Sequence, residues 1–66
     1  MKTGVIKFWN ESKKFGFIIP DEGGDDVFVH VTNVVGKVDL VKDQHVEYEI
    51  YSGKSGKIAA KNVNGI

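Results

Sequence analysis

The stretch FGFIIPDEGGDDVFVH, residues 15–30, contains the pattern that decides the fold. It holds one short run of β-branched and aromatic residues at 15–20 and all but the last residue of a second run at 26–31, on either side of the turn-forming segment Asp21-Glu22-Gly23-Gly24. Two such runs joined by a glycine-containing turn are typical of a β-hairpin. We therefore expect two paired strands at the centre of the chain.

Similar runs flank this hairpin at residues 3–10, 44–51 and 57–63, whereas residues 32–43 contain few strand formers. A turn is expected at Ser52-Gly53-Lys54-Ser55-Gly56. No window has the 3.6-residue apolar period of an amphipathic helix. Five short strands in 66 residues fit an all-β fold, a five-stranded antiparallel barrel in which closure leaves no strand edge exposed. We expect residues 1–66 to form a single domain.

The composition limits what else the chain can be. It has no cysteine, so it contains neither disulfides nor cysteine-based zinc sites. In domains below about 70–80 residues the core rarely supplies more than about 3–5 kcal/mol of stability. No apolar run approaches the ~18 residues of a membrane span, and the N-terminus lacks the apolar segment of a signal peptide. We expect a cytoplasmic protein without a membrane partner.

The formal net charge is zero, but the charges are unevenly distributed along the chain. Residues 1–20 hold four lysines and one acid, residues 21–26 hold four acids, and residues 27–66 hold five lysines and four acids. A polyanion would therefore be bound by a local basic patch rather than by overall attraction. A surface with scattered, solvated charge is the alternative interpretation.

Strand alternation in residues 44–51 separates a core face from a solvent face. Val46, Tyr48 and Ile50 share one face. The opposite face carries His45, Glu47, Glu49 and Tyr51. Since the polar set must contact water, the first three residues are predicted to be core.

The same alternation sorts the central hairpin. Ile18, Val27 and Val29 are the natural core residues. The side chains on the opposite faces are Phe15, Phe17, Phe28 and His30. Several outward aromatic rings on adjacent strands exceed the scattered apolar exposure of an ordinary surface. The alternative is that the two faces are inverted and these rings form the core.

As a binding site, the aromatic cluster is flanked by Lys7, Lys13 and Lys14. Aromatic rings stack on unpaired bases of any identity, each contributing about 1–3 kcal/mol, and lysines follow the phosphates. Gly16, between two of the phenylalanines, allows a neighbour to pack closely against the strand. This arrangement predicts a surface for single-stranded nucleic acid.

Two motifs in this region resemble a known family. Residues 13–18, Lys-Lys-Phe-Gly-Phe-Ile, resemble the Lys-Gly-Phe-Gly-Phe-Ile motif of cold shock domains, and residues 27–31, Val-Phe-Val-His-Val, resemble their Val-Phe-Val-His-Phe motif. Residues 4–10 resemble the N-terminal motif of the same family, and residues 60–63 resemble its C-terminal motif. The resemblance implies an oligonucleotide-binding (OB) barrel, a single cold shock domain that binds single-stranded RNA and DNA with low sequence specificity. It also implies that the protein acts as an RNA chaperone, which melts weak RNA secondary structure without ATP.

Alternation, the flanking lysines and the resemblance together predict ten residues for nucleic-acid binding. They are Lys7, Phe8, Trp9, Asn10, Lys13, Phe15, Phe17, Phe28, His30 and Lys57. The chain contains no arginine, which removes bidentate contacts to guanine and is consistent with low sequence specificity.

Three positions depart from the family pattern. Lys14 replaces a glycine, which demands ordinary backbone angles there. Val31 replaces a stacking phenylalanine, and residues 36–39 lack the aromatic that members usually present. At about 1–3 kcal/mol per stacked base, losing two rings weakens binding by at most roughly 2–6 kcal/mol. We expect fewer bound bases, or weaker binding, than in a typical member.

Phe8 and Trp9 appear in the reverse of the family order. Strict alternation puts Trp9 beside Lys7 on the binding face. The family pattern puts Phe8 there instead, which requires a bulge in the first strand. We expect both rings to contribute.

Other site classes have little support. His30 and His45 are fifteen positions apart without further ligands, so neither a metal site nor a cofactor is expected. The acidic turn at 21–26 lacks the pattern of a calcium loop. No set of nucleophile and base is present, and we do not expect an enzyme.

Two other functions remain open. A protein-interaction barrel or a homodimer would use the same aromatic face. A small ribosome-bound barrel, such as a translation initiation factor, is the other. We expect a monomer, with a strand-swapped dimer as the alternative.

Overall fold

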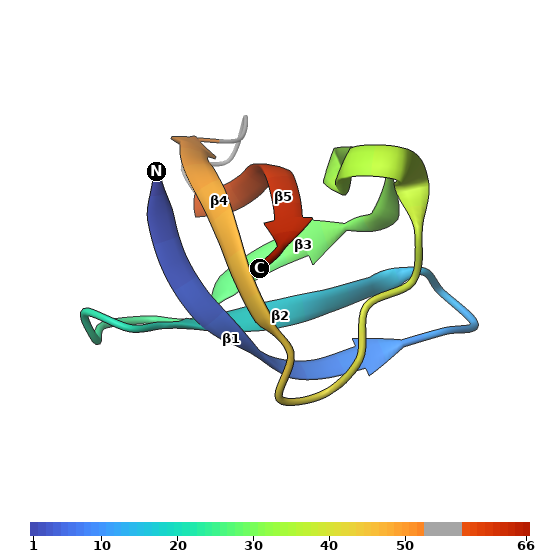
Figure 1. Ribbon diagram of the computed structural model, residues 1–66, viewed down its shortest axis with the longest axis horizontal. Coiled ribbons are helices and arrows are strands. Elements are labelled where there is room, and N and C mark those ends of the chain that lie inside the picture. The colour runs from blue at the N-terminus through green and yellow to red at the C-terminus, as the bar shows by residue number, and fades with distance from the viewer. Residues whose placement is uncertain (53–57) are drawn as a thin grey trace.

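The computed structural model describes residues 1–52 and 58–66, and its strands curl into a closed barrel (Figure 1). The strands are β1 (Lys2–Asn10), β2 (Phe15–Pro20), β3 (Val27–His30), β4 (His45–Ser52) and β5 (Ile58–Gly65). Their order around the barrel is β1-β2-β3-β5-β4, and β4 pairs again with β1. The expected all-β, five-stranded OB-type barrel is confirmed. Residues 53–57, which include most of the turn predicted at 52–56, lie outside the described residues.

The central hairpin has the predicted form. β2 and β3 pair antiparallel, with Phe17 opposite Phe28. The turn between them contains Gly23 and Gly24 at φ of 90° and 95°, a left-handed conformation that only glycine adopts without steric cost. β3 ends at His30, one residue earlier than predicted, because a 3-10 turn begins at Val31.

One strand pair differs from the antiparallel expectation. β3 and β5 are parallel where they meet, at Phe28 and Ala59. The physical reason is parity: in a closed ring with an odd number of strands, neighbours cannot alternate in direction all the way round. At least one parallel pair is therefore unavoidable in this barrel, and it lies between β3 and β5.

β1 contains the bulge that the family pattern requires. Ile6 pairs with Ile18, but Phe8 pairs with Phe17, so Lys7 is an extra residue on the β1 side. A bulge of this kind shifts the alternation of the rest of the strand by one position. Phe8 therefore projects to the same side as Phe17. The strict-alternation expectation, which placed Trp9 there, is wrong.

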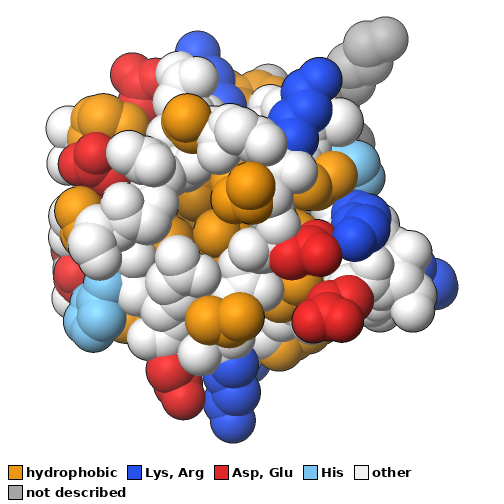
Figure 2. Space-filling view, turned by 45° about the vertical axis from the view of Figure 1, so that its right-hand side comes forward, with side chains coloured by type: hydrophobic (Ala, Val, Ile, Leu, Met, Phe, Trp, Pro, Cys, Tyr) orange, Lys and Arg blue, Asp and Glu red, His pale blue; other side chains and the backbone are white. Residues whose placement is uncertain are grey.

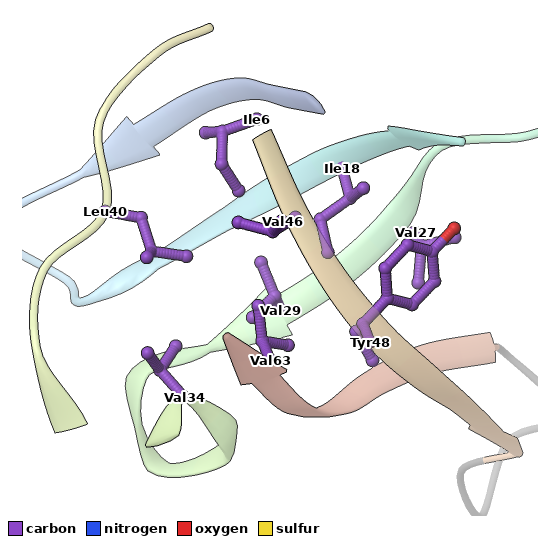
Figure 3. Packing of buried hydrophobic residues seen from close by; sticks show 10 residues of the cluster. Ile6, Ile18, Val27, Val29, Val34, Leu40, Val46, Tyr48 and Val63 are labelled. Atoms are coloured by element: carbon purple, nitrogen blue, oxygen red, sulfur yellow. The ribbon is translucent and has the colours of Figure 1, made fainter. Parts of the chain in front are cut away.

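The core fills the interior of the barrel (Figure 3). Its buried members are Ile6, Ile18, Val27, Val29, Val34, Leu40, Val46, Tyr48, Ala60 and Val63. Five of the six residues predicted as core in β2, β3 and β4 are fully buried, and the sixth, Ile50, is partly buried against them. The five are Ile18, Val27, Val29, Val46 and Tyr48. The aromatic cluster is outside, so the alternative with inverted faces is wrong.

The segment between β3 and β4 has no regular strand, as expected. It contains two short 3-10 turns, η1 (Val31–Asn33) and η2 (Val35–Lys37). In Figure 1 these turns lie on the same side of the barrel as the β1–β2 turn. None of the helical turns in residues 1–52 and 58–66 is long and apolar enough to cross a membrane.

Candidate nucleic-acid interface

All four phenylalanines of the chain gather on the outside of the barrel. Phe8 comes from β1, Phe15 and Phe17 from β2, and Phe28 from β3. Five of the six ring pairs have centroids 5.5–6.3 Å apart, within the usual range for aromatic pairs. Phe8 is 41% and Phe28 37% exposed. We call these four residues the aromatic platform; it offers ring surface to a ligand.

His30 extends the platform along β3. It lies directly opposite Phe15 on β2, so both side chains project to the same face. Its Nδ1 accepts a hydrogen bond from the backbone N–H of Thr32 at 3.3 Å and lies 3.1 Å from that residue's Oγ1. These contacts fix the ring and leave Nε2 as its other hydrogen-bonding atom.

Trp9 is not part of the platform. It pairs with Gly16 and packs partly buried against the core. A Cβ on Gly16 would lie only 2.8 Å from Trp9 Cε3, so the indole sits directly over this glycine on the inner side of the sheet. Its Nε1 donates a hydrogen bond to Asp39 at 3.2 Å. Of the two rings predicted to stack, only Phe8 is among the outward aromatics.

The cations near the platform differ in their surroundings. Lys7, the bulged residue, forms an ion pair with Asp26 at 2.8 Å. Lys13 is exposed and has no ion pair within the described part of the chain. Lys57, the third predicted phosphate contact, lies outside the described residues. Figure 2 shows one face of the molecule, on which acidic and basic side chains are interspersed among apolar ones.

Asn10 shapes the turn that carries Lys13. Its Oδ1 accepts a hydrogen bond from the Lys13 backbone N–H at 3.0 Å, and its carbonyl oxygen accepts one from Lys14 N–H at 2.7 Å. An asparagine that bonds the backbone ahead of it in this way is typical of tight turns. Asn10 therefore holds the lysine-containing turn next to the end of the platform.

The model of the 'Cold-shock' DNA-binding domain family matches residues 2–66 of this chain. The chain belongs to the cold shock domain family. It is 48% identical over 65 residues to the cold shock-like protein CspC of Escherichia coli strain K12, covering 96% of this chain and 93% of that protein. It is 47% identical over 66 residues to the cold shock protein CspA of Rhizobium meliloti, covering 96% of each. It is 46% identical over 63 residues to the cold shock-like protein CspG of Shewanella violacea, covering 92% of this chain and 90% of that protein.

Membership in this family makes the chain a nucleic-acid-binding cold shock domain. Proteins of this family bind nucleic acid and are not enzymes, which confirms the expectation that the chain is not an enzyme. Among residues 1–52 and 58–66 the cold shock domain has no group of three or more His, Asp or Glu side chains placed to hold a metal ion.

Lys14 of this cold shock domain has a backbone conformation that the sequence argument missed. Its φ is +61°, in the left-handed region, and not the ordinary angle expected for a lysine. The β1–β2 turn imposes this angle through the bond from Lys14 N–H to Asn10. The carbonyl of Lys14 in turn accepts a hydrogen bond from Val31 N–H at 2.9 Å. Position 14 thus has the left-handed backbone conformation that glycine favours, although its residue is a lysine.

The Lys14 side chain meets an acid that is distant in sequence. Its Nζ lies 3.1 Å and 3.0 Å from the two carboxylate oxygens of Asp39, the residue that also accepts from Trp9. Hydrogen bonds from Lys14 and then from Trp9 lower the pKa of the Asp39 carboxyl. This Asp39 contact ties the β1–β2 turn and the end of β1 to the segment before β4.

Replacing Asp39 with Asn is expected to lower the melting temperature slightly at neutral pH. Because the folded pKa of Asp39 is lowered, its stabilising effect is present above the unfolded value near 4 and is lost as the pH falls through the folded value. The difference between wild type and Asp39→Asn should therefore disappear at low pH. Thermal unfolding followed across pH 7 to about 2.5 measures this.

Asp25→Asn is the matched control, because it removes one exposed carboxylate that has no ion pair among the described residues. If the melting temperatures of both variants fall by the same amount at every pH, the contact of Asp39 with Lys14 and Trp9 does not stabilise the fold. Added salt should also reduce the Asp39 effect, since both partners are exposed and screened.

Sequence reasoning missed the two acids that partner the lysines. Asp26 is expected in the acidic turn and at the start of the strand run 26–31 but without a lysine partner, and Asp39 has no expected role. Asp39 is 25 positions from Lys14 and 30 from Trp9, so no local pattern links them. The available signals are the acidic composition of residues 21–26 and the alternation that puts Asp26 on the face of Phe28, and neither identifies a lysine partner.

Proposed function

We propose that this cold shock domain binds single-stranded RNA and DNA with low sequence preference. It acts in the cytoplasm as a monomeric RNA chaperone, with Lys7, Lys13 and Lys57 as phosphate contacts. The observation that carries the proposal is the exposure of the platform: all four phenylalanines lie outside a barrel whose interior is filled by aliphatic residues and Tyr48. Aromatic faces accept any unpaired base, which supports low sequence preference.

Chaperone activity follows from binding one state of RNA better than another. Bases stacked on the platform are withdrawn from base pairing, so binding favours the single-stranded form. The shift is limited by the difference in affinity between the two forms, and no ATP is required. Weak hairpins are therefore expected to melt, while long duplexes remain paired.

The direct test is a titration of a dye-labelled oligothymidine, following dye anisotropy and Trp9 emission together, with a matched duplex alongside. Binding of the single strand without binding of the duplex supports the proposal. Since Trp9 lies on the inner side of the sheet, we expect little direct quenching of its emission by bases. No anisotropy change at low salt with excess protein would contradict the proposal.

Salt dependence tests the lysine contacts. With two or three phosphate contacts, log affinity should fall with log salt at a slope of about −1.4 to −2.1. Lys13→Ala is expected to reduce the magnitude of that slope by about 0.7, the value of one contact on a single strand. Lys42→Ala, at an exposed position before β4, should leave the slope unchanged. Equal slopes for both variants would remove Lys13 from the interface.

The same experiments separate nucleic-acid binding from protein association. An apolar protein interface on the platform would be nearly indifferent to salt and would appear as a molecular size that rises with protein concentration. Sedimentation or light scattering of the free protein over a wide concentration range measures this. A constant monomeric size together with oligonucleotide binding supports the proposed function.

A further inference from the structure

An outward tyrosine lies at the end of β4, away from the motifs that define the family. Tyr51 is 37% exposed, the same fraction as Phe28. Its neighbour Ile50 packs against the core, and Ala60 on the paired strand is buried, so Tyr51 projects from the outer surface. Alternation had placed it among the solvent-facing residues of β4 without any role.

Strand register connects Tyr51 to the platform. Phe28 on β3 is directly opposite Ala59 on β5, and Ala59 is directly opposite Tyr51 on β4. On the other side, Phe28 pairs with Phe17, and Phe17 pairs with Phe8. Directly paired residues project to the same side of a sheet. One row of outward side chains therefore crosses all five strands, with a single small residue, Ala59, between the platform and Tyr51.

A hydrogen bond links the tyrosine ring to the platform side of the molecule. Asn33 Nδ2 donates to the Tyr51 hydroxyl oxygen at 3.2 Å. Asn33 belongs to η1, which begins immediately after His30. The bond orients Tyr51 toward η1, and the hydroxyl keeps its own hydrogen free to donate. An oriented ring loses less side-chain entropy when a ligand stacks on it.

We infer that Tyr51 is a further base-stacking residue, which takes an unpaired base of the same strand after that strand leaves Phe28 and crosses Ala59. The inference rests on the proposed function. The two rings are separated by two strand spacings, about 9–10 Å along the sheet. Ala59 has a small side chain that leaves this path open, and the Tyr51 hydroxyl, whose oxygen accepts from Asn33, supplies a donor for a base edge or a phosphate. Tyr51 thereby adds a ring to a chain that lacks one at Val31.

The test compares Tyr51→Ala with wild type on oligothymidines of about four and about ten nucleotides, lengths near the lower and middle of the range for OB folds. Affinity for the longer strand is expected to fall roughly 5- to 100-fold, whereas affinity for the shorter strand should not change. Tyr51→Phe, which keeps the ring, should retain most of the affinity. Phe28→Ala should weaken both strands.

Nuclear magnetic resonance of the wild-type protein gives a second measurement that does not depend on the variant folding. The ring protons of Tyr51 are expected to shift on addition of the longer strand and to remain unchanged with the shorter one. If Tyr51 does not shift at saturation, or if Tyr51→Ala binds the longer strand like wild type while Phe28→Ala weakens it, the inference is overturned and the proposed function stands. If the wild-type protein binds neither strand, the proposed function itself fails.

Discussion

Replacing both Phe17 and Phe28 with alanine is expected to abolish measurable binding of single-stranded oligonucleotides. Phe17 and Phe28 face each other across β2 and β3, with ring centroids 5.8 Å apart, at the centre of the platform. Losing two stacked bases at about 1–3 kcal/mol each corresponds to a loss of roughly 30-fold to 20,000-fold in affinity. Truncation effects of neighbouring rings are not additive, so the upper value is a bound. Anisotropy titration of a labelled oligothymidine measures the change.

The matched control is a double truncation elsewhere on the surface. Val41 and Ile66 are 60% and 71% exposed and lie outside the platform, so replacing both with alanine removes apolar surface without removing a ring. This control should bind like wild type. Because the platform rings lie on the outer face, thermal unfolding should also show that the Phe17/Phe28 variant remains folded. Undiminished binding by that folded variant would rule out the platform as the binding site.

Gly16→Ala is expected to destabilise the protein by about 1–3 kcal/mol, the usual cost of overpacking. A Cβ at this position would clash with the carbonyl oxygen of Phe8 and would lie 2.8 Å from Trp9 Cε3. The first of these atoms is backbone, so β1 and β2 must move apart. In a domain of this size the cost is a large share of the roughly 3–5 kcal/mol available. Thermal unfolding should show a melting temperature lower by roughly 5–20 °C.

Gly65→Ala provides the comparison, because it makes the same substitution in a strand. There the new Cβ would meet the side-chain amide nitrogen of Gln44 at 2.8 Å, the far end of a flexible side chain that can move away. Its melting temperature should change little. Equal destabilisation of the two variants would mean that the close approach of the β1 backbone is not what makes Gly16→Ala costly.

Alternation alone was sufficient to predict the faces of β2, β3 and β4. In these strands the residue period is unbroken through the barrel, so Ile18, Val27 and Val46 are buried and Phe17 and Phe28 are not. The hairpin turn was also predictable, because two adjacent glycines between two strand-forming runs are typical of a turn that needs positive φ angles. These features depend on residues that are close in sequence.

The remaining features depend on contacts between distant residues or on closure of the ring. The bulge at Lys7 has no local signature, so only the family pattern indicated that Phe8 would join the platform. The left-handed angle of Lys14 is imposed by the turn around it, against the preference of the residue. The contact of Asp39 with Lys14 and Trp9 joins exposed polar groups whose interaction is weak, and weak interactions leave little trace in composition.

The bulge also determines which one-residue insertions and deletions in β1 would keep its inward-facing residues in the core. Gly4 and Ile6 before it, and Trp9 after it, all face inward, although Trp9 is five positions from Gly4 and three from Ile6, odd spacings that strict alternation would put on opposite faces. The strand thus consists of two segments that are out of phase by one residue, with Lys7 as the insertion between them. Deleting Lys7 would leave both segments facing as they do now and would remove only a cation. Inserting or deleting a residue between Asn10 and Phe15 leaves that phase intact and changes only the turn. A one-residue change anywhere between Gly4 and Ile6, in contrast, would exchange core and solvent faces for part of the strand.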